Sequence, residues 1–132
     1  MAANDQLLHL YDERLSVVIS TRGNVPAIVY WGSFLGQNPL QHDLFTRAVL
    51  GGGVDLDPPL GIIAQHHDGW LGNPGVEGCF PDGSGSFPHF IISSSTNTTT
   101  SANFTLRDAD LHLDLQINVD IHASGVLTIT GA

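Results

Sequence analysis

The residues that could do chemistry are concentrated in one Gly- and Pro-rich stretch near the middle of the chain. Within it, His66 and His67 are adjacent and Asp68 follows, a combination that suggests a metal site. Adjacent residues on a strand point to opposite faces, however, so the two imidazoles do not easily bind one ion. The sequence therefore predicts no metal site here, and we expect no cofactor.

Carboxyl groups near this stretch suggest a second kind of chemistry, because glycoside hydrolysis uses two of them, one as acid and one as nucleophile or base. The candidates all lie among glycines and prolines, where Asp most often closes turns. Nothing in the sequence indicates that any two of them have well-separated pKa values, so no catalytic pair is predicted. These candidates are Asp55, Asp57, Asp68, Glu77 and Asp82.

The single cysteine, Cys79, could form a nucleophile–base pair with His66 or His89. No third group that would orient such a base is evident. A lone cysteine is commonly a small buried apolar side chain, and this is what we expect of Cys79. One cysteine also excludes an internal disulfide.

Trp70 is the residue of this stretch with the clearest binding chemistry. An exposed tryptophan beside carboxylates and amides offers a sugar a flat apolar face together with oriented polar groups. The alternative, which the sequence leaves open, is that the indole simply packs against its own loop. We take Trp70, Glu77 and Asp82 as the candidate sugar-contact loop.

The elements that position this loop are strands. The clearest signal is the strict alternation of apolar and polar residues over 111–121, which is typical of an antiparallel strand with one wet face. This alternation places His112 and His122 on the polar face. Helical spacing of apolar residues over 40–49, with Asn38 as N-cap, predicts one short helix. Other strands are predicted at 7–11, 15–20, 27–31, 104–106 and 126–130, and residues 51–90 are predicted to be largely loop.

The predicted fold class is therefore mainly β: part of an antiparallel β-supersandwich with one short helix. A length of 132 residues fits one domain, 1–132. The last predicted strand is followed at once by Gly131 and Ala132 and would leave an open edge, which proteins usually protect. We therefore expect the domain to be incomplete, a fragment of something longer.

The charge of the chain excludes some partners. There are 13 acidic residues against four arginines and no lysine, giving a formal net charge of −9. Such a surface repels phosphate backbones and lacks the basic patch that anionic membranes attract, so neither nucleic acid nor membrane is an expected partner. No apolar run approaches a membrane span and no secretory signal opens the chain, so a cytoplasmic location is expected.

One segment resembles a known family. Residues 63–78 read IAQHHDGWLGNPGVEG, similar to a segment in the N-terminal domain of family 36 glycoside hydrolases of the actinobacterial α-galactosidase type. The strand starting at Leu15, the strand ending at Tyr30-Trp31-Gly32, and the long strand with its Gly125-Val126-Leu127 return also fit in order. The sequence departs from the family at Asn73, where Arg is usual, and at Cys79-Phe80, where His-Arg is usual. These departures argue against transferring the family's polar contacts to this loop.

The resemblance implies an enzyme with an N-terminal β-supersandwich, a central (β/α)₈ barrel and a C-terminal β-domain that hydrolyses terminal α-galactosyl residues with retention. Its two catalytic aspartates belong to the barrel, and neither barrel motif is present here. No catalytic residue is therefore assigned, and the chain alone is expected to be inactive. The implied partners are the barrel of the same enzyme and its α-galactoside substrate, and the resemblance also allows a homo-oligomer. The alternatives are a free-standing carbohydrate-binding β-sandwich and a purely structural β-protein.

Overall fold

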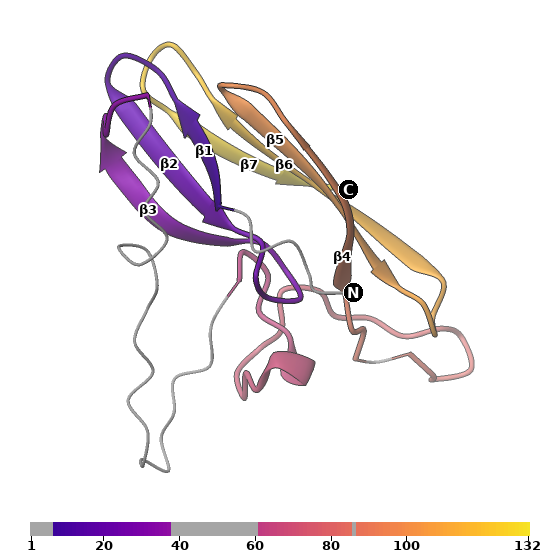
Figure 1. Ribbon diagram of the computed structural model, residues 1–132. Coiled ribbons are helices and arrows are strands. Elements are labelled where there is room, and N and C mark those ends of the chain that lie inside the picture. The colour runs from indigo at the N-terminus through magenta and orange to yellow at the C-terminus, as the bar shows by residue number, and fades with distance from the viewer. Residues whose placement is uncertain (1–6, 38–60, 86) are drawn as a thin grey trace.

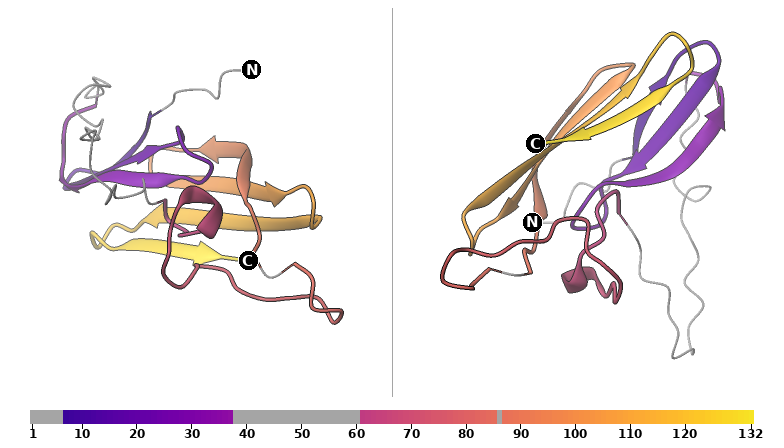
Figure 2. Two further views of the ribbon diagram at one scale, coloured as in Figure 1. Left: turned by 90° about the horizontal axis from the view of Figure 1, so that it is seen from below. Right: turned by 180° about the vertical axis from the view of Figure 1, so that it is seen from behind.

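The protein folds as two antiparallel sheets that face each other (Figure 1). The computed structural model describes residues 7–37, 61–85 and 87–132. Figure 2 shows the sheets as two layers, with the segment that precedes the second sheet crossing one end of them. The first sheet has the order β1-β2-β3, formed by Leu7–Tyr11, Leu15–Ser20 and Ala27–Ser33. The second has the order β4-β5-β6-β7, formed by Ile91–Asn97, Ser101–Asp108, Leu113–Ile121 and Leu127–Gly131.

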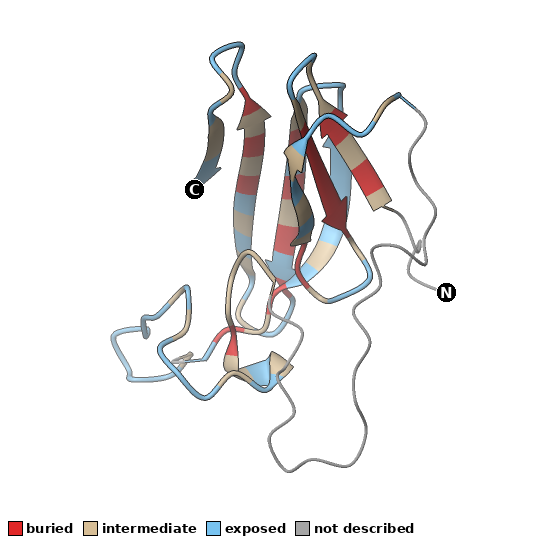
Figure 3. Ribbon diagram, turned by 90° about the vertical axis from the view of Figure 1, so that its left-hand side faces the viewer, coloured by how far each residue is buried: buried red, intermediate tan, exposed pale blue. Residues whose placement is uncertain are grey.

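The core lies between the two sheets and follows from the two-residue period of the strands. In β5, buried Ala102, Phe104 and Leu106 alternate with residues that face outward, and β6 repeats the pattern (Figure 3). Burying these apolar side chains is the main favourable term in forming the sandwich. The facing side chains of the first sheet are Leu8, Leu10, Val17 and Ile19.

The predicted fold class is confirmed in its main statement, since the described residues are mainly β. Strands β1 and β2 have the predicted bounds, and β3 extends two residues further than predicted. The only helical element among the described residues is a 3-10 turn, η2, at His66–Asp68. The helix predicted at 40–49 lies outside the described residues.

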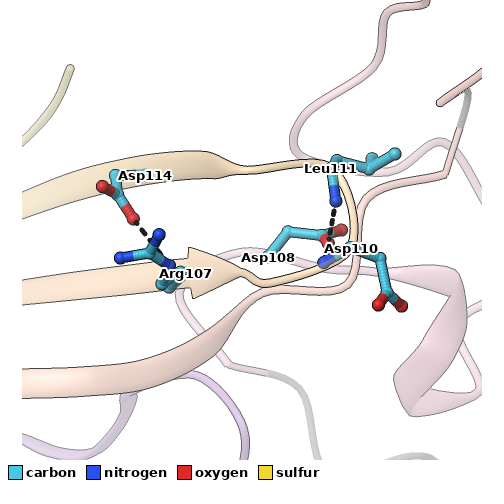
Figure 4. Close-up of polar contacts among 5 residues, drawn as sticks. All are labelled: Arg107, Asp108, Asp110, Leu111 and Asp114. Atoms are coloured by element: carbon cyan, nitrogen blue, oxygen red, sulfur yellow. Dashed lines mark hydrogen bonds and ion pairs between the residues drawn. The ribbon is translucent and has the colours of Figure 1, made fainter.

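The long strand is shorter at its start than predicted. β6 begins at Leu113, and His112 lies in the preceding turn with φ 55, a left-handed conformation uncommon for a side-chain-bearing residue. The turn forms because the Asp108 carboxylate accepts hydrogen bonds from the backbone N–H groups of Asp110 and Leu111, as Figure 4 shows. His122 lies just beyond the strand and its Nε2 is 2.8 Å from Thr128 Oγ1. The placement of both histidines on the polar face of one strand is therefore wrong.

Strand β4 was not predicted. Its sequence, IISSSTN, has no apolar alternation, and most of its residues are exposed. It forms because its backbone pairs with β5 in register from Ile91↔Arg107 to Asn97↔Ala102, with an irregularity between Ile92 and Ser94. The strand is thus specified by its neighbour rather than by its own pattern.

Candidate functional site

Gln65 fixes the position of the segment that carries the candidate loop. Its side chain is only 3% exposed, and it forms a pair of hydrogen bonds with the backbone of Phe90. The Phe90 N–H donates to Gln65 Oε1 at 2.9 Å, and Gln65 Nε2 donates to the Phe90 carbonyl at 2.9 Å. The Gln65 amide thereby satisfies both backbone hydrogen-bonding groups of Phe90, as a neighbouring strand would.

Asp68 is held by two neutral amides. Gln65 Nε2 donates to Asp68 Oδ2 at 2.8 Å, and Asn24 Nδ2 donates to Asp68 Oδ1 at 2.6 Å. Asn24 lies in the turn between β2 and β3, and its Nδ2 is also 3.4 Å from His89 Nε2. These contacts join three segments far apart in the sequence: the β2–β3 turn, η2 and the residues that lead into β4.

The neighbouring histidines His66 and His67 have different partners. His66 Nδ1 is 2.7 Å from the Trp70 carbonyl, and its ring meets the edge of Phe87. The His67 ring is stacked on His89, with centroids 4.3 Å apart. The two residues lie on a 3-10 turn rather than on a strand, so the reason given from the sequence for their divergence is wrong. The described part of the chain contains no group of three or more His, Cys, Asp or Glu residues arranged to hold a metal ion.

Asp108 completes this polar network from β5. It is buried, and its carboxylate accepts backbone N–H groups from His89 at 2.7 Å, Leu111 at 2.9 Å and Asp110 at 3.0 Å. Desolvation by itself would raise the pKa of Asp108, but these hydrogen bonds and the nearby His89 outweigh it and lower the pKa. The group therefore acts as a fixed acceptor and is poorly suited to donate a proton at neutral pH.

Trp70 is half-buried and folds onto its own loop. Its Nε1 donates to the Asn73 carbonyl at 2.9 Å. Its ring lies so close to Gly72 that a Cβ there would be 2.7 Å from the nearest ring atom, which only glycine avoids. The next residue, Leu71, is 95% exposed at the tip of the loop. The geometry thus agrees with packing of the indole inside its loop and leaves only part of the ring open to a ligand.

The other two candidate residues are exposed. Asp82 Oδ1 accepts hydrogen bonds from Ser84 Oγ at 2.6 Å and from the Ser84 N–H at 2.9 Å, which lower the pKa of Asp82. Among the described residues no hydrogen bond or ring contact joins any two of Trp70, Glu77 and Asp82, so they do not form one constellation here. The expectation that Cys79 is buried is wrong: it is exposed.

The described carboxyl groups whose pKa is clearly displaced are not tuned as proton donors for glycoside hydrolysis. Such a reaction needs one acid with a raised pKa beside an ionised carboxylate. Every carboxyl pKa that is clearly displaced among the described residues is displaced downward, by hydrogen bonds from nearby N–H or hydroxyl groups. They are those of Asp12, Asp82 and Asp108.

Sequence reasoning missed the network around Gln65 and Asp68, and it also missed Trp31. Trp31 lies opposite Val17, which is fully buried, yet the indole is 62% exposed at the edge of the first sheet. The only sequence signal for the network is the polar run that follows the apolar pair Ile62 and Ile63, both of which pack against the core. Apart from the Gln65–Asp68 bond and the turn at Asp108, its partners are 19 to 65 residues apart, and local patterns do not report such pairings.

These features define a β-sandwich domain in which a network of hydrogen bonds around Gln65 and Asp68 holds the loop segment at one end. Comparison with known proteins gives one informative similarity. An alpha-galactosidase of Escherichia coli is 29% identical to the chain over 124 residues, which is 93% of this chain but 17% of that protein. No protein-family model matches the chain. No solved structure matches it either.

The similarity runs through the candidate loop as well as the strands, because it leaves out few residues of the chain. The chain is therefore similar to a small part of a glycoside hydrolase, and its β-sandwich suits a non-catalytic domain of such an enzyme. No helix within residues 7–37, 61–85 and 87–132 has the length and apolarity to cross a membrane.

Proposed function

We propose that the chain is the N-terminal, non-catalytic β-domain of a larger α-galactosidase-like hydrolase that removes terminal α-galactosyl residues. The observation that carries this proposal is the similarity over 93% of the chain to a small part of an alpha-galactosidase. In this role the domain packs beside a catalytic (β/α)₈ barrel, which supplies the two catalytic carboxylates. A cytoplasmic location stays a prediction.

The chemistry of the described residues supports a role without catalysis. A retaining glycosidase needs a nucleophilic carboxylate and a carboxylic acid about 5 Å apart. The carboxyl groups with displaced pKa values instead hold turns and backbone N–H groups, and none is tuned as an acid. This fits the proposal that the substrate-cleaving groups belong to the catalytic barrel.

The candidate loop is fixed at its base and exposed at its tip. Gln65 and Asp68 tie its base to β4 and to the β2–β3 turn, while Leu71 at its tip is almost fully exposed. A loop whose base is fixed and whose tip is exposed can contact another surface of the enzyme. We propose that this loop, with Trp70, Glu77 and Asp82, borders the sugar pocket of the barrel.

A chimeric enzyme tests both parts of the proposal. The chain replaces the matched 124-residue region of the Escherichia coli alpha-galactosidase, and hydrolysis of a chromogenic α-galactoside is measured. We expect a folded, active chimera. Replacing Trp70 by Ala should then raise KM or lower kcat/KM, whereas the matched Trp31→Ala change outside the loop should leave both unchanged.

Two outcomes contradict the proposal at different levels. A chimera that folds with the parent's assembly state and thermal stability but lacks activity would argue against equivalence of the domains. An active chimera whose kinetics are the same with and without the Trp70 side chain would remove the sugar-contact role of the loop and leave the domain assignment in place.

A free-standing carbohydrate-binding module is the second candidate. It is favoured by the shared core of the two sheets, which lets the described strands bury apolar surface without a partner, and by the exposed Trp31. Such a module should bind galactose by itself. Titrating galactose into the isotopically labelled chain, with glucose as control, separates the candidates: saturable shifts clustered near one tryptophan would favour the module.

A further inference from the structure

One polar side chain on the outer face of the first sheet is fully buried. Ser16 precedes Val17 along β2, and Val17 packs in the core, so Ser16 lies on the opposite, outer face. Its side chain is nevertheless 0% exposed, and a polar group buried in this way needs hydrogen-bond partners. The partners of Ser16 come from two other segments, one before it and one after it in the sequence.

The later of these segments follows β3 directly, and we name it the strap, residues 34–37. The chain leaves β3 at the end of the sheet where β1 turns into β2 (Figure 1). There the Phe34 N–H donates to the Arg14 carbonyl at 3.1 Å, and the Leu35 N–H donates to Ser16 Oγ at 3.0 Å. The Phe34 ring also packs on Tyr11 of β1, with centroids 5.6 Å apart. The strap is thus held by β1, by β2 and by the turn between them.

His9 of β1 is the other partner of Ser16. His9 Nε2 is 2.8 Å from Ser16 Oγ, and the imidazole is stacked on Tyr11 with centroids 4.8 Å apart. Because Ser16 Oγ already accepts the Leu35 N–H, the Ser16 hydroxyl donates its own hydrogen to His9 Nε2. That nitrogen accepts a hydrogen bond only while the imidazole is neutral, with its hydrogen on Nδ1.

The surroundings of His9 favour this neutral form. Burial lowers the pKa of His9 below the ordinary imidazole value of about 6.5. The titratable and charged side chains on this face and in the adjoining turn are Tyr11, Tyr30, Asp12, Glu13 and Arg14. Of these, Asp12 is held by its own turn, where its carboxylate accepts the N–H groups of Arg14 and Leu15. Burial rather than an ion pair therefore sets the protonation of His9.

We propose that His9 is an acid-sensitive latch for the strap. While His9 is neutral, Ser16 is satisfied and holds the Leu35 N–H. Uptake of a proton makes Nε2 a donor, so Ser16 Oγ faces donors from both His9 and Leu35, and its own hydrogen loses its acceptor. Release of the strap then returns the charged imidazole to water.

The direction of the pH effect follows from the lowered pKa of His9. The closed strap is fully stabilised above the ordinary imidazole pKa, and this stabilisation is lost as the pH falls through the lower value of the closed state. Imidazoles change charge between about pH 5 and pH 8, so the release belongs to that range.

Amide hydrogen exchange of the 132-residue chain, followed by NMR between about pH 8 and pH 5, tests the proposal. After correction for the intrinsic effect of pH, the protection of the Leu35 amide should fall in acid. The expected fall is roughly tenfold for each unit by which the pKa of the closed state lies below the ordinary one. The Val119 amide, in a fully buried residue of β6, reports the whole fold and should keep its protection.

His9→Gln separates a latch from a contact that is only structural. The glutamine side-chain oxygen can accept the Ser16 hydroxyl but does not titrate, so Leu35 should stay protected at both ends of the range. His122→Gln is the matched control, because His122 Nε2 is also 2.8 Å from a hydroxyl, that of Thr128, in an exposed contact on the other sheet. This variant should lose Leu35 protection in acid as the wild type does.

Three results would overturn the proposal. Leu35 protection could stay constant with pH in the wild type, or it could fall equally in His9→Gln. An equal loss at Val119 would show unfolding of the whole chain instead of release of the strap. If His9→Gln folds poorly, the wild type decides, since the titration of the His9 ring signals and the change at Leu35 must share one midpoint. No outcome depends on sugar binding or hydrolysis, so failure here would leave the domain assignment in place.

Discussion

The segment that leads into β4 and the strand β7 at the other side of the four-stranded sheet differ in their hydrogen bonding. Just before β4, side chains pair with the backbone: Gln65 pairs with Phe90, and Asp108 accepts the His89 N–H. At the β7 edge the outward backbone groups have no partner within the described part of the chain. The difference teaches that the chain uses its buried polar side chains, Gln65 and Asp108, to hold the segment that carries the candidate loop.

Of the substitutions that test this difference, removal of the Gln65 side chain should change the free energy of unfolding most. Gln65→Ala leaves the Phe90 N–H and carbonyl without partners in a buried position and takes one donor from Asp68. We expect a loss of about 3 kcal/mol in the free energy of unfolding, because unsatisfied buried backbone groups are costly. Chemical denaturation followed by circular dichroism measures it.

The control for this prediction is Gln116→Ala, which removes an exposed glutamine on β6. Surface changes of this kind usually alter stability by about 0.5 kcal/mol or less. Equal effects of the two substitutions would show that Gln65 does not act through its hydrogen bonds.

Asp108 should have the next largest effect, and one that depends on pH. Asp108→Asn replaces the oxygen that accepts the His89 N–H with a donor, which we expect to lower stability by about 2 kcal/mol at neutral pH. The pKa of Asp108 is lowered in the folded protein, so the stabilisation is present above the unfolded carboxyl pKa of about 4 and lost as pH falls through the lower folded value.

Unfolding curves of wild type and this variant from pH 7 downward check the sign. The difference between them should shrink as the solution becomes acidic. A difference that grew on acidification would contradict the assignment of Asp108 as an ionised acceptor.

Substitution at the exposed Ile129 of β7 should have only a small effect on the fold. Ile129→Lys lies at an exposed position, so the free energy of unfolding measured at high dilution should change by about 0.5 kcal/mol or less. A large loss of stability would mean that the Ile129 side chain is covered by another part of the chain.

The smallest expected effect concerns the two tryptophans. Trp31 is exposed, whereas Trp70 is packed against Gly72 and donates its N–H to Asn73. In single-tryptophan variants made with Trp→Phe changes, acrylamide should quench Trp31 fluorescence more strongly than that of Trp70. The reverse order would mean that the loop holds its indole open to solvent.

A strand could be predicted from the sequence where apolar and polar residues alternate because one face of the strand is buried, as in residues 113–121. The serine-rich β4 could not, because it is specified by its pairing with β5. The candidate loop was placed from its composition and its resemblance to a family. The network that supports it was missed, because Asn24 and His89 meet only through the fold. The packing of Trp70 on Gly72 was one of two readings that the sequence left open.

The measurement that tests the account most directly is the thermal unfolding of the chain alone, with galactose and with glucose as the control. Because the two sheets share one core, we expect a cooperative transition. For a domain without its own sugar site, galactose should not move the midpoint. A rise with galactose alone would contradict the account, since a ligand at a hundred times its Kd stabilises by about 2.7 kcal/mol, and would identify a self-sufficient carbohydrate-binding module.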